Sequence, residues 1–118
     1  MITHPKTEEL VQAVAHWIDQ IRPSLDPRNA FLARVAVNVL SVVERELSRG
    51  PAAEARAVEA MAGVLGRSGE FEALNRELCE RIRSGELTEV TPGLVAALKT
   101  IALDQLAIDQ PKYRPEGG

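Results

Sequence analysis

The 118 residues are 45% hydrophobic and 26% charged, a composition typical of one folded domain, which excludes an intrinsically disordered chain. A formal net charge of −3, with both signs mixed along the chain, gives no long-range attraction to nucleic acid or to anionic membranes, so we expect neither partner. Aromatic residues make up only 3%, so Ala, Leu and Val must fill most of the core, which favours an all-helical fold.

Two helices are predicted in the first part of the chain. The first begins with Thr7 as its N-cap, ends before Pro23, and repeats apolar residues at spacings of three and four: Leu10, Val14, Trp17, Ile18 and Ile21. The second begins at Asp26, whose carboxylate can accept from free backbone amides, while Pro27 loses nothing at the first helical position. This second helix is predicted to run to about Arg49.

Three further helices are predicted after a break at Gly50 and Pro51, two residues that commonly end helices. An alanine-rich third helix ends near Gly66 and Gly69. A fourth helix closes at Gly85 and is marked by a repeat of apolar residues: Phe71, Leu74, Leu78 and Ile82. The fifth starts at Thr91 and Pro92, is apolar on more than one face, and ends at Pro111.

Short connections make sequential helices antiparallel neighbours. We therefore predict an all-α fold, a compact up-and-down bundle of about five helices in a single helical domain over residues 1–118. The second and fifth helices are expected to be central, because their apolar positions cover more than one face. The segments 1–6 and 112–118 are polar, the second also being rich in Gly and Pro, and are expected to be flexible tails.

No catalytic or metal-binding motif appears in the sequence: HExxH, a Gly-rich phosphate loop and a Gly-x-Ser-x-Gly elbow are all absent. Gln12, His16 and Asp19 stack on consecutive turns, but Gln is a poor metal ligand, so we interpret them as a solvated helix face. Apart from Arg83, Cys79 lacks the basic surroundings of a reactive thiol, and we interpret it as a half-buried packing residue. We expect no cofactor and no metal, and a non-enzymatic role is favoured.

The cellular compartment is predicted from cysteine usage and from the lack of targeting segments. Cys79 is the sole cysteine, which excludes an internal disulfide and fits a reducing compartment. The segment from Met1 to Glu9 has no apolar core, and no later stretch stays uncharged long enough to cross a bilayer. We therefore expect a cytoplasmic protein.

A polar stripe on the second predicted helix is the main functional lead. Arg34, Asn38, Ser41 and Arg45 follow one another at spacings of four, three and four, which places them on one helical face. Large apolar residues crowd the other faces: Phe31, Leu32, Val35, Val39, Leu40, Val43 and Leu47. If the helix is buried, the stripe must meet carboxylates, carbonyls, a ligand or another protein.

Two interpretations of this stripe are open. In the favoured one, the polar residues form a buried network that settles helix packing, with Arg45 pairing with Glu46, Glu77 or Glu80. In the other, they bind an anionic ligand or the carboxylates of a partner protein. The candidate binding residues are Arg34, Asn38, Arg45, Glu46, Asn75 and Arg83.

Several segments also resemble a known family. They are the run from Arg34 to Leu47, the pairs Leu74-Asn75 and Leu78-Cys79, the run from Ile82 to Gly85, and the run from Ile108 to Tyr113. Together they resemble a bacterial family of small helical proteins, domain-of-unknown-function family 6285, over about Pro5 to Tyr113. Its members are often encoded beside aminoglycoside-phosphotransferase-like kinases and acyl-CoA dehydrogenases. The resemblance implies a metabolic accessory role and carries no assigned catalytic residues.

These observations lead to two functional hypotheses. The first is a non-enzymatic accessory or protein-interaction module that acts with a kinase-like or acyl-CoA-metabolising enzyme, or that forms a homodimer through its apolar last helix and Trp17. The alternative is a small-molecule-binding protein in which Arg34, Asn38 and Arg45 hold a carboxylate or an acyl-CoA-like anion.

Overall fold

The computed structural model describes residues 5–113. Within that range the chain forms four α-helices and one 3-10 helix, and it has no strand: α1 (Thr7–Ile21), η1 (Arg22–Ser24), α2 (Pro27–Leu65), α3 (Phe71–Arg83) and α4 (Leu94–Asp109). The prediction of an all-α fold is confirmed, but the count of five helices is too high. Among the described residues, no helix combines the length and the apolar character that a membrane span needs. Most of the predicted tails, residues 1–4 and 114–118, lie outside the described residues.

The predicted break at Gly50 and Pro51 is wrong, because α2 continues through both residues. Proline removes one helical hydrogen bond, to the carbonyl of Leu47, and its ring crowds that carbonyl, but its fixed φ is compatible with a helix. The segment that follows, 52–62, is rich in Ala and Glu, which are strong helix formers. These flanking preferences outweigh the loss at one position, and the second and third predicted helices are a single helix.

The chain divides into two compact units, Met1–Gly50 and Pro51–Gly118, and the boundary falls inside α2. We call them the N-terminal unit and the C-terminal unit. Each unit has its own set of packed helices and its own pattern of burial.

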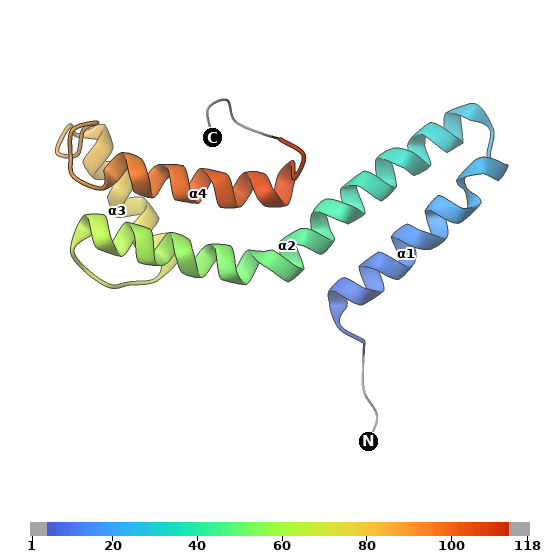
Figure 1. The fold of residues 1–118 in the computed structure, drawn as a ribbon, viewed down its shortest axis with the longest axis horizontal. Coiled ribbons are helices and arrows are strands. Elements are labelled where there is room, and N and C mark those ends of the chain that lie inside the picture. The colour runs from blue at the N-terminus through green and yellow to red at the C-terminus, as the bar shows by residue number, and fades with distance from the viewer. Residues whose placement is uncertain (1–4, 114–118) are drawn as a thin grey trace, which may run out of the picture. The chain divides into compact units, whose positions relative to one another are not determined.

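The N-terminal unit is a helical hairpin in which α1 runs back along the first half of α2 (Figure 1). The turn between them is held by Ser24, whose hydroxyl donates to the carbonyl of Ile21 at 2.6 Å. Asp26 precedes α2 and accepts from Asn29 twice, from its side-chain amide at 2.6 Å and from its backbone N–H at 3.4 Å. The predicted start of this helix at Asp26 and Pro27 is thereby confirmed.

Burial in the N-terminal unit is slight. Among its described residues Ala33 is the buried hydrophobic residue, and α1 has none. Phe31 is 64% exposed and Val39 is 56% exposed, so the expectation that this helix is central and apolar on buried faces is wrong for its first half. Two helices have too few neighbours to cover an apolar stripe this wide.

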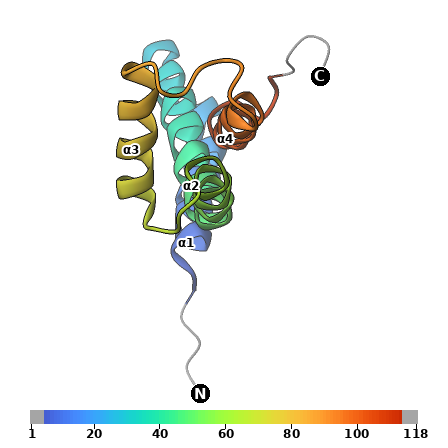
Figure 2. The same cartoon turned by 90° about the vertical axis from the view of Figure 1, so that its left-hand side faces the viewer.

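The C-terminal unit consists of the second half of α2 with α3 and α4. Figures 1 and 2 show α4 alongside this half of α2, with α3 crossing both helices. All three helices and the α3–α4 loop contribute to one core: Ala57, Met61, Leu65, Leu74, Leu78, Leu87 and Leu94. Met61 and Leu74 are fully buried, and Ile108 near the end of α4 is 1% exposed.

Ion pairs and a glycine turn fix the helices of the C-terminal unit. Arg56 of α2 donates to both carboxylate oxygens of Asp104 of α4, at 2.7 and 3.1 Å. This contact raises the pKa of Arg56 above its ordinary value.

The fifth predicted helix begins later than expected, at Leu94, because Gly93 turns the backbone with φ 83°. Thr91 closes the preceding loop by accepting from the Thr88 backbone N–H at 2.8 Å.

Candidate functional site

The polar stripe lies on the α2 part of the N-terminal unit, and its members differ in exposure. Arg34 and Asn38 are exposed, whereas Ser41 and Arg45 are half-buried. The hydroxyl of Ser41 donates to the carbonyl of Val37 at 2.9 Å, a contact within the same helix. The expectation of a buried stripe is therefore wrong for Arg34 and Asn38, whose polar groups already reach solvent and need no internal partner.

The other candidate residues lie elsewhere. Glu46 follows Arg45 on α2 and is exposed; one step of about 100° round the helix takes it off the stripe. Asn75 and Arg83 are exposed on α3, in the C-terminal unit. They are eight residues apart, which places them about 80° from each other round the helix. The helical faces therefore group Arg34, Asn38 and Arg45, and not all six residues.

Glu77, one of the expected partners of Arg45, is held by two arginines of its own unit. Its Oε1 accepts from Nε of Arg67 at 2.7 Å, and its Oε2 lies 3.0 Å from Nη2 of Arg81. That second oxygen is buried and accepts no hydrogen bond of good geometry, so its contact with Arg81 is an ion pair. The network fastens the loop after α2 to α3, which is a structural role.

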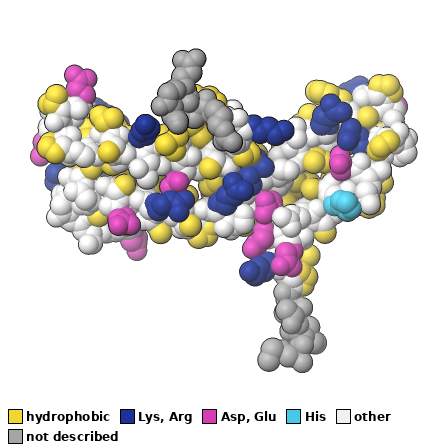
Figure 3. Space-filling view, viewed as in Figure 1, with side chains coloured by type: hydrophobic (Ala, Val, Ile, Leu, Met, Phe, Trp, Pro, Cys, Tyr) yellow, Lys and Arg dark blue, Asp and Glu magenta, His cyan; other side chains and the backbone are white. Residues whose placement is uncertain are grey.

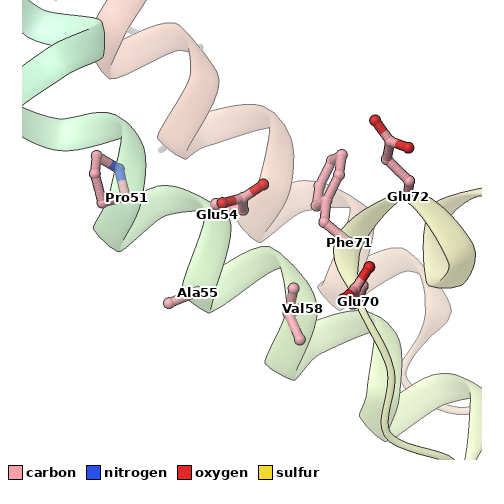
Figure 4. Close-up of a pocket in the computed structure, with 7 residues that line it drawn as sticks. All are labelled: Pro51, Glu54, Ala55, Val58, Glu70, Phe71 and Glu72. Atoms are coloured by element: carbon pink, nitrogen blue, oxygen red, sulfur yellow. The ribbon is translucent and has the colours of Figure 1, made fainter.

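A shallow groove of about 600 Å³ opens in the C-terminal unit between the second half of α2 and the start of α3. Its lining combines apolar side chains and three glutamates, as Figure 4 shows: Pro51, Glu54, Ala55, Val58, Glu70, Phe71 and Glu72. This groove was not predicted from the sequence, because its residues come from two separate segments without a common motif. The described residues contain no group of three His, Cys, Asp or Glu side chains placed to hold a metal ion.

Cys79 is exposed on α3, not half-buried as the sequence suggested. It lies on the solvent side of that helix, while Leu74 and Leu78 are buried on the core side. Its place next to the buried Leu78 follows from helical geometry, because adjacent residues point about 100° apart.

Both helices of the N-terminal unit carry large apolar residues that are exposed, and we call these residues together the apolar face. Its members among the described residues are at least 38% exposed: Leu10, Val14, Trp17, Phe31, Leu32, Val35, Val39, Val43 and Leu47. Round α2 the apolar members span an arc of about 160°, and the polar stripe lies outside that arc; on α1 the three members lie within about 60° of one another. Apolar side chains are visible on the surface in Figure 3.

Comparison with known proteins identifies a family that matches this chain. The family model described as Domain of unknown function (DUF6285) matches residues 23–113, which is more than half of the chain. The chain belongs to this family. The match confirms the resemblance seen in the sequence, although it begins after α1 and not at Pro5. The DUF6285 region thus includes the polar stripe, the α2 part of the apolar face and the described helices of the C-terminal unit. No curated protein and no solved structure matches the chain.

Proposed function

We propose that this chain is a non-enzymatic accessory module that works by binding other protein chains. The observation that carries this proposal is the apolar face of the N-terminal unit, where Trp17 is 59% exposed and Phe31 is 64% exposed. Clusters of exposed apolar residues often mark interaction sites in folded proteins, and large aromatic residues are the usual anchors of such sites.

The polar stripe, on a separate face of α2, supports the same function. The guanidinium of Arg34 has no ion-pair partner among the described residues, and Asn38 lies one turn away with its amide exposed. An exposed Arg with a neighbouring Asn suits the carboxylates of a protein partner, because guanidinium and carboxylate can form two parallel hydrogen bonds. The hairpin therefore offers one apolar and one polar surface for binding.

The enzymes implied by the family resemblance are the partners that we propose for the polar stripe. The test is co-expression of the full chain with a kinase-like enzyme and, separately, with an acyl-CoA dehydrogenase, of the kinds that the family resemblance implies. We expect one of them to co-elute with the chain in size-exclusion chromatography. Arg34→Glu should weaken that complex by about tenfold or more, since it reverses a charge at the contact.

The control is Arg76→Glu, which makes the same charge change at an exposed position of α3 in the C-terminal unit. It should leave the complex intact. Loss of the complex in both variants would assign the effect to net charge and not to the stripe. Separate elution of the chain from both enzymes at every tested concentration would overturn the proposed enzyme partners.

The alternative function, binding of a small anion, is favoured by the same Arg34, which has no ion-pair partner within the described part of the chain. In this case CoA esters or organic acids should raise the melting temperature of the wild-type chain, and Arg34→Ala should abolish the rise. A ligand at a hundred times its Kd adds about 2.7 kcal/mol to stability, which a thermal-shift assay detects readily. A flat response to all these compounds, with an enzyme complex present, would decide for the interaction module.

A further inference from the structure

Two charged residues of opposite sign border the apolar face along α2. Arg28 stands before Phe31 at one end, and Glu46 stands beside Leu47 at the other. They are eighteen residues apart, which is five full helical turns, so both point in the same direction and are about 27 Å apart along the axis. Both are exposed, and neither has an ion-pair partner within residues 5–113.

This placement of charges distinguishes between two orientations in which α2 of a second copy of the chain can pack against α2 of the first. In a parallel arrangement in register, Arg28 meets Arg28 and Glu46 meets Glu46, so like charges repel at both ends. In an antiparallel arrangement centred on residue 37, Arg28 meets Glu46 of the partner subunit at both ends. The valines in the middle, Val35 and Val39, then meet the same two residues of the second copy. Charges that flank an apolar helix face set the orientation of helix pairs in this manner.

We propose that two copies of this chain associate through their apolar faces in antiparallel order, and that the pairing of Arg28 with Glu46 of the partner subunit sets that order. The inference rests on the proposed function, that of an interaction module, and names a partner for the apolar face. Two hairpins supply four helices, the number that encloses a bundle core, whereas one hairpin leaves its apolar face in water. A twofold axis repeats each contact, as in most homodimers.

The size of the apolar face is consistent with a second copy of the chain as its partner. Its nine residues are 38% to 64% exposed and include a Trp and a Phe, side chains that can each bury about 150 to 250 Å², whereas a stable interface buries about 800 Å² on each partner. Six of its members lie on α2, and α1 contributes Leu10, Val14 and Trp17. Trp17 and Phe31 provide the large anchors that such interfaces need.

The first experiment measures self-association of the full chain by sedimentation velocity from about 1 μM to about 100 μM. We expect the wild-type chain to dimerise in this range. Arg28→Glu and Glu46→Arg, made singly, should each weaken dimerisation by about tenfold or more, because each places like charges together at both ends of the interface. The double variant should return to within about threefold of wild type. Circular dichroism checks that each variant keeps its helices.

Mixing the two single variants tests whether these charges act across the interface, whereas the single variants test the order, because in a parallel dimer each would keep like charges opposite like charges, as in wild type. An Arg28→Glu chain and a Glu46→Arg chain present opposite charges to each other at both ends, so the mixture should form a heterodimer at concentrations where each variant alone is monomeric. A charge effect within one chain cannot produce this result. Glu72→Arg, at an exposed position of α3, is the control and should dimerise as wild type does.

The outcomes separate this inference from the proposed enzyme complex. A wild-type chain that stays monomeric throughout the range, or a mixture that does not associate, overturns the antiparallel dimer. If the monomeric chain still co-elutes with an enzyme, the proposed function stands and this inference falls. If the chain dimerises and the mixture associates without any enzyme complex, this inference stands and the enzyme partners fall. A Val39→Glu chain should remain monomeric and helical, and dimerisation of that variant would also overturn the proposal.

Discussion

The three helices of the C-terminal unit enclose a core of seven buried residues, although side chains such as Val90 and Val95 stay exposed. The two helices of the N-terminal unit bury only Ala33 among its described hydrophobic residues and leave nine large apolar side chains at least 38% exposed. Both units share α2, so the difference does not come from the type of element. Met61 in the second half of α2 is fully buried, while Val39 in the first half is 56% exposed. The number of neighbouring helices decides whether an apolar stripe becomes a core or a surface.

The largest expected effect is in the C-terminal core. Leu74→Ala removes a fully buried side chain and leaves a cavity, so it should lower the free energy of unfolding by about 2 to 5 kcal/mol. Leu32→Ala in the N-terminal unit is the matched variant, and at half exposure it should cost under about 1 kcal/mol while the chain is monomeric. Urea denaturation measures both values. Equal losses would contradict the difference between the units.

The next effect concerns the boundary between the units. Pro51→Ala restores a backbone donor inside α2 and removes the clash with the preceding turn, so it should raise the free energy of unfolding by about 2 kcal/mol. Pro27→Ala is the control, because proline at the first helical position costs nothing, and it should change stability little. A decrease on Pro51→Ala would show that the boundary needs its proline.

Glu77→Gln tests the ion pairs that hold the C-terminal unit together. The amide removes the charge that Arg67 and Arg81 share, and the loss should be about 1 kcal/mol, because solvent screens side chains that are 25% to 42% exposed. Glu86→Gln is the control: its carboxylate lies 3.7 Å from Arg81 and its side chain is 61% exposed, so no measurable change is expected. Thermal unfolding compares the two variants.

The smallest effect is at the start of α2 in the N-terminal unit. The side chain of Asn29, followed by its backbone N–H, lowers the pKa of Asp26 below 3.8. A lowered carboxyl pKa stabilises the folded state above pH 3.8, and the contribution is lost as the pH falls through the lowered value. Asp26→Ala should therefore melt slightly below wild type at neutral pH, and the difference should vanish in acid. A difference that grows on acidification would contradict this assignment.

Much of the fold follows from local sequence. Pro27 and Phe71 begin helices where capping and periodicity place them, since these signals depend on neighbouring residues only. The break at Pro51 was predicted wrongly, because the cost of one lost hydrogen bond had to be weighed against the helical preference of both flanks. The late start of α4 depends on Gly93, whose positive φ no periodic pattern reveals.

The candidate site was less predictable. Helical spacing correctly placed Arg34, Asn38 and Arg45 on one face, but it could not show that Arg34 and Asn38 are exposed, because exposure depends on how many helices pack around α2. The distant partner Glu77 was assigned to Arg45 from charge alone, and it binds Arg67 and Arg81 instead. Whether the stripe binds a partner or a ligand stays a prediction.

The passage of α2 through both units has a consequence for amide hydrogen exchange. An amide hydrogen exchanges when the cooperative unit that contains it unfolds, even where one helix passes through two such units. Amides near Met61 should exchange only when the C-terminal core unfolds, whereas those near Val39 should exchange faster in a monomer and become protected on dimerisation. Pro51 has no amide hydrogen, so it gives no signal in the exchange measurement. One continuous helix should therefore show two protection levels.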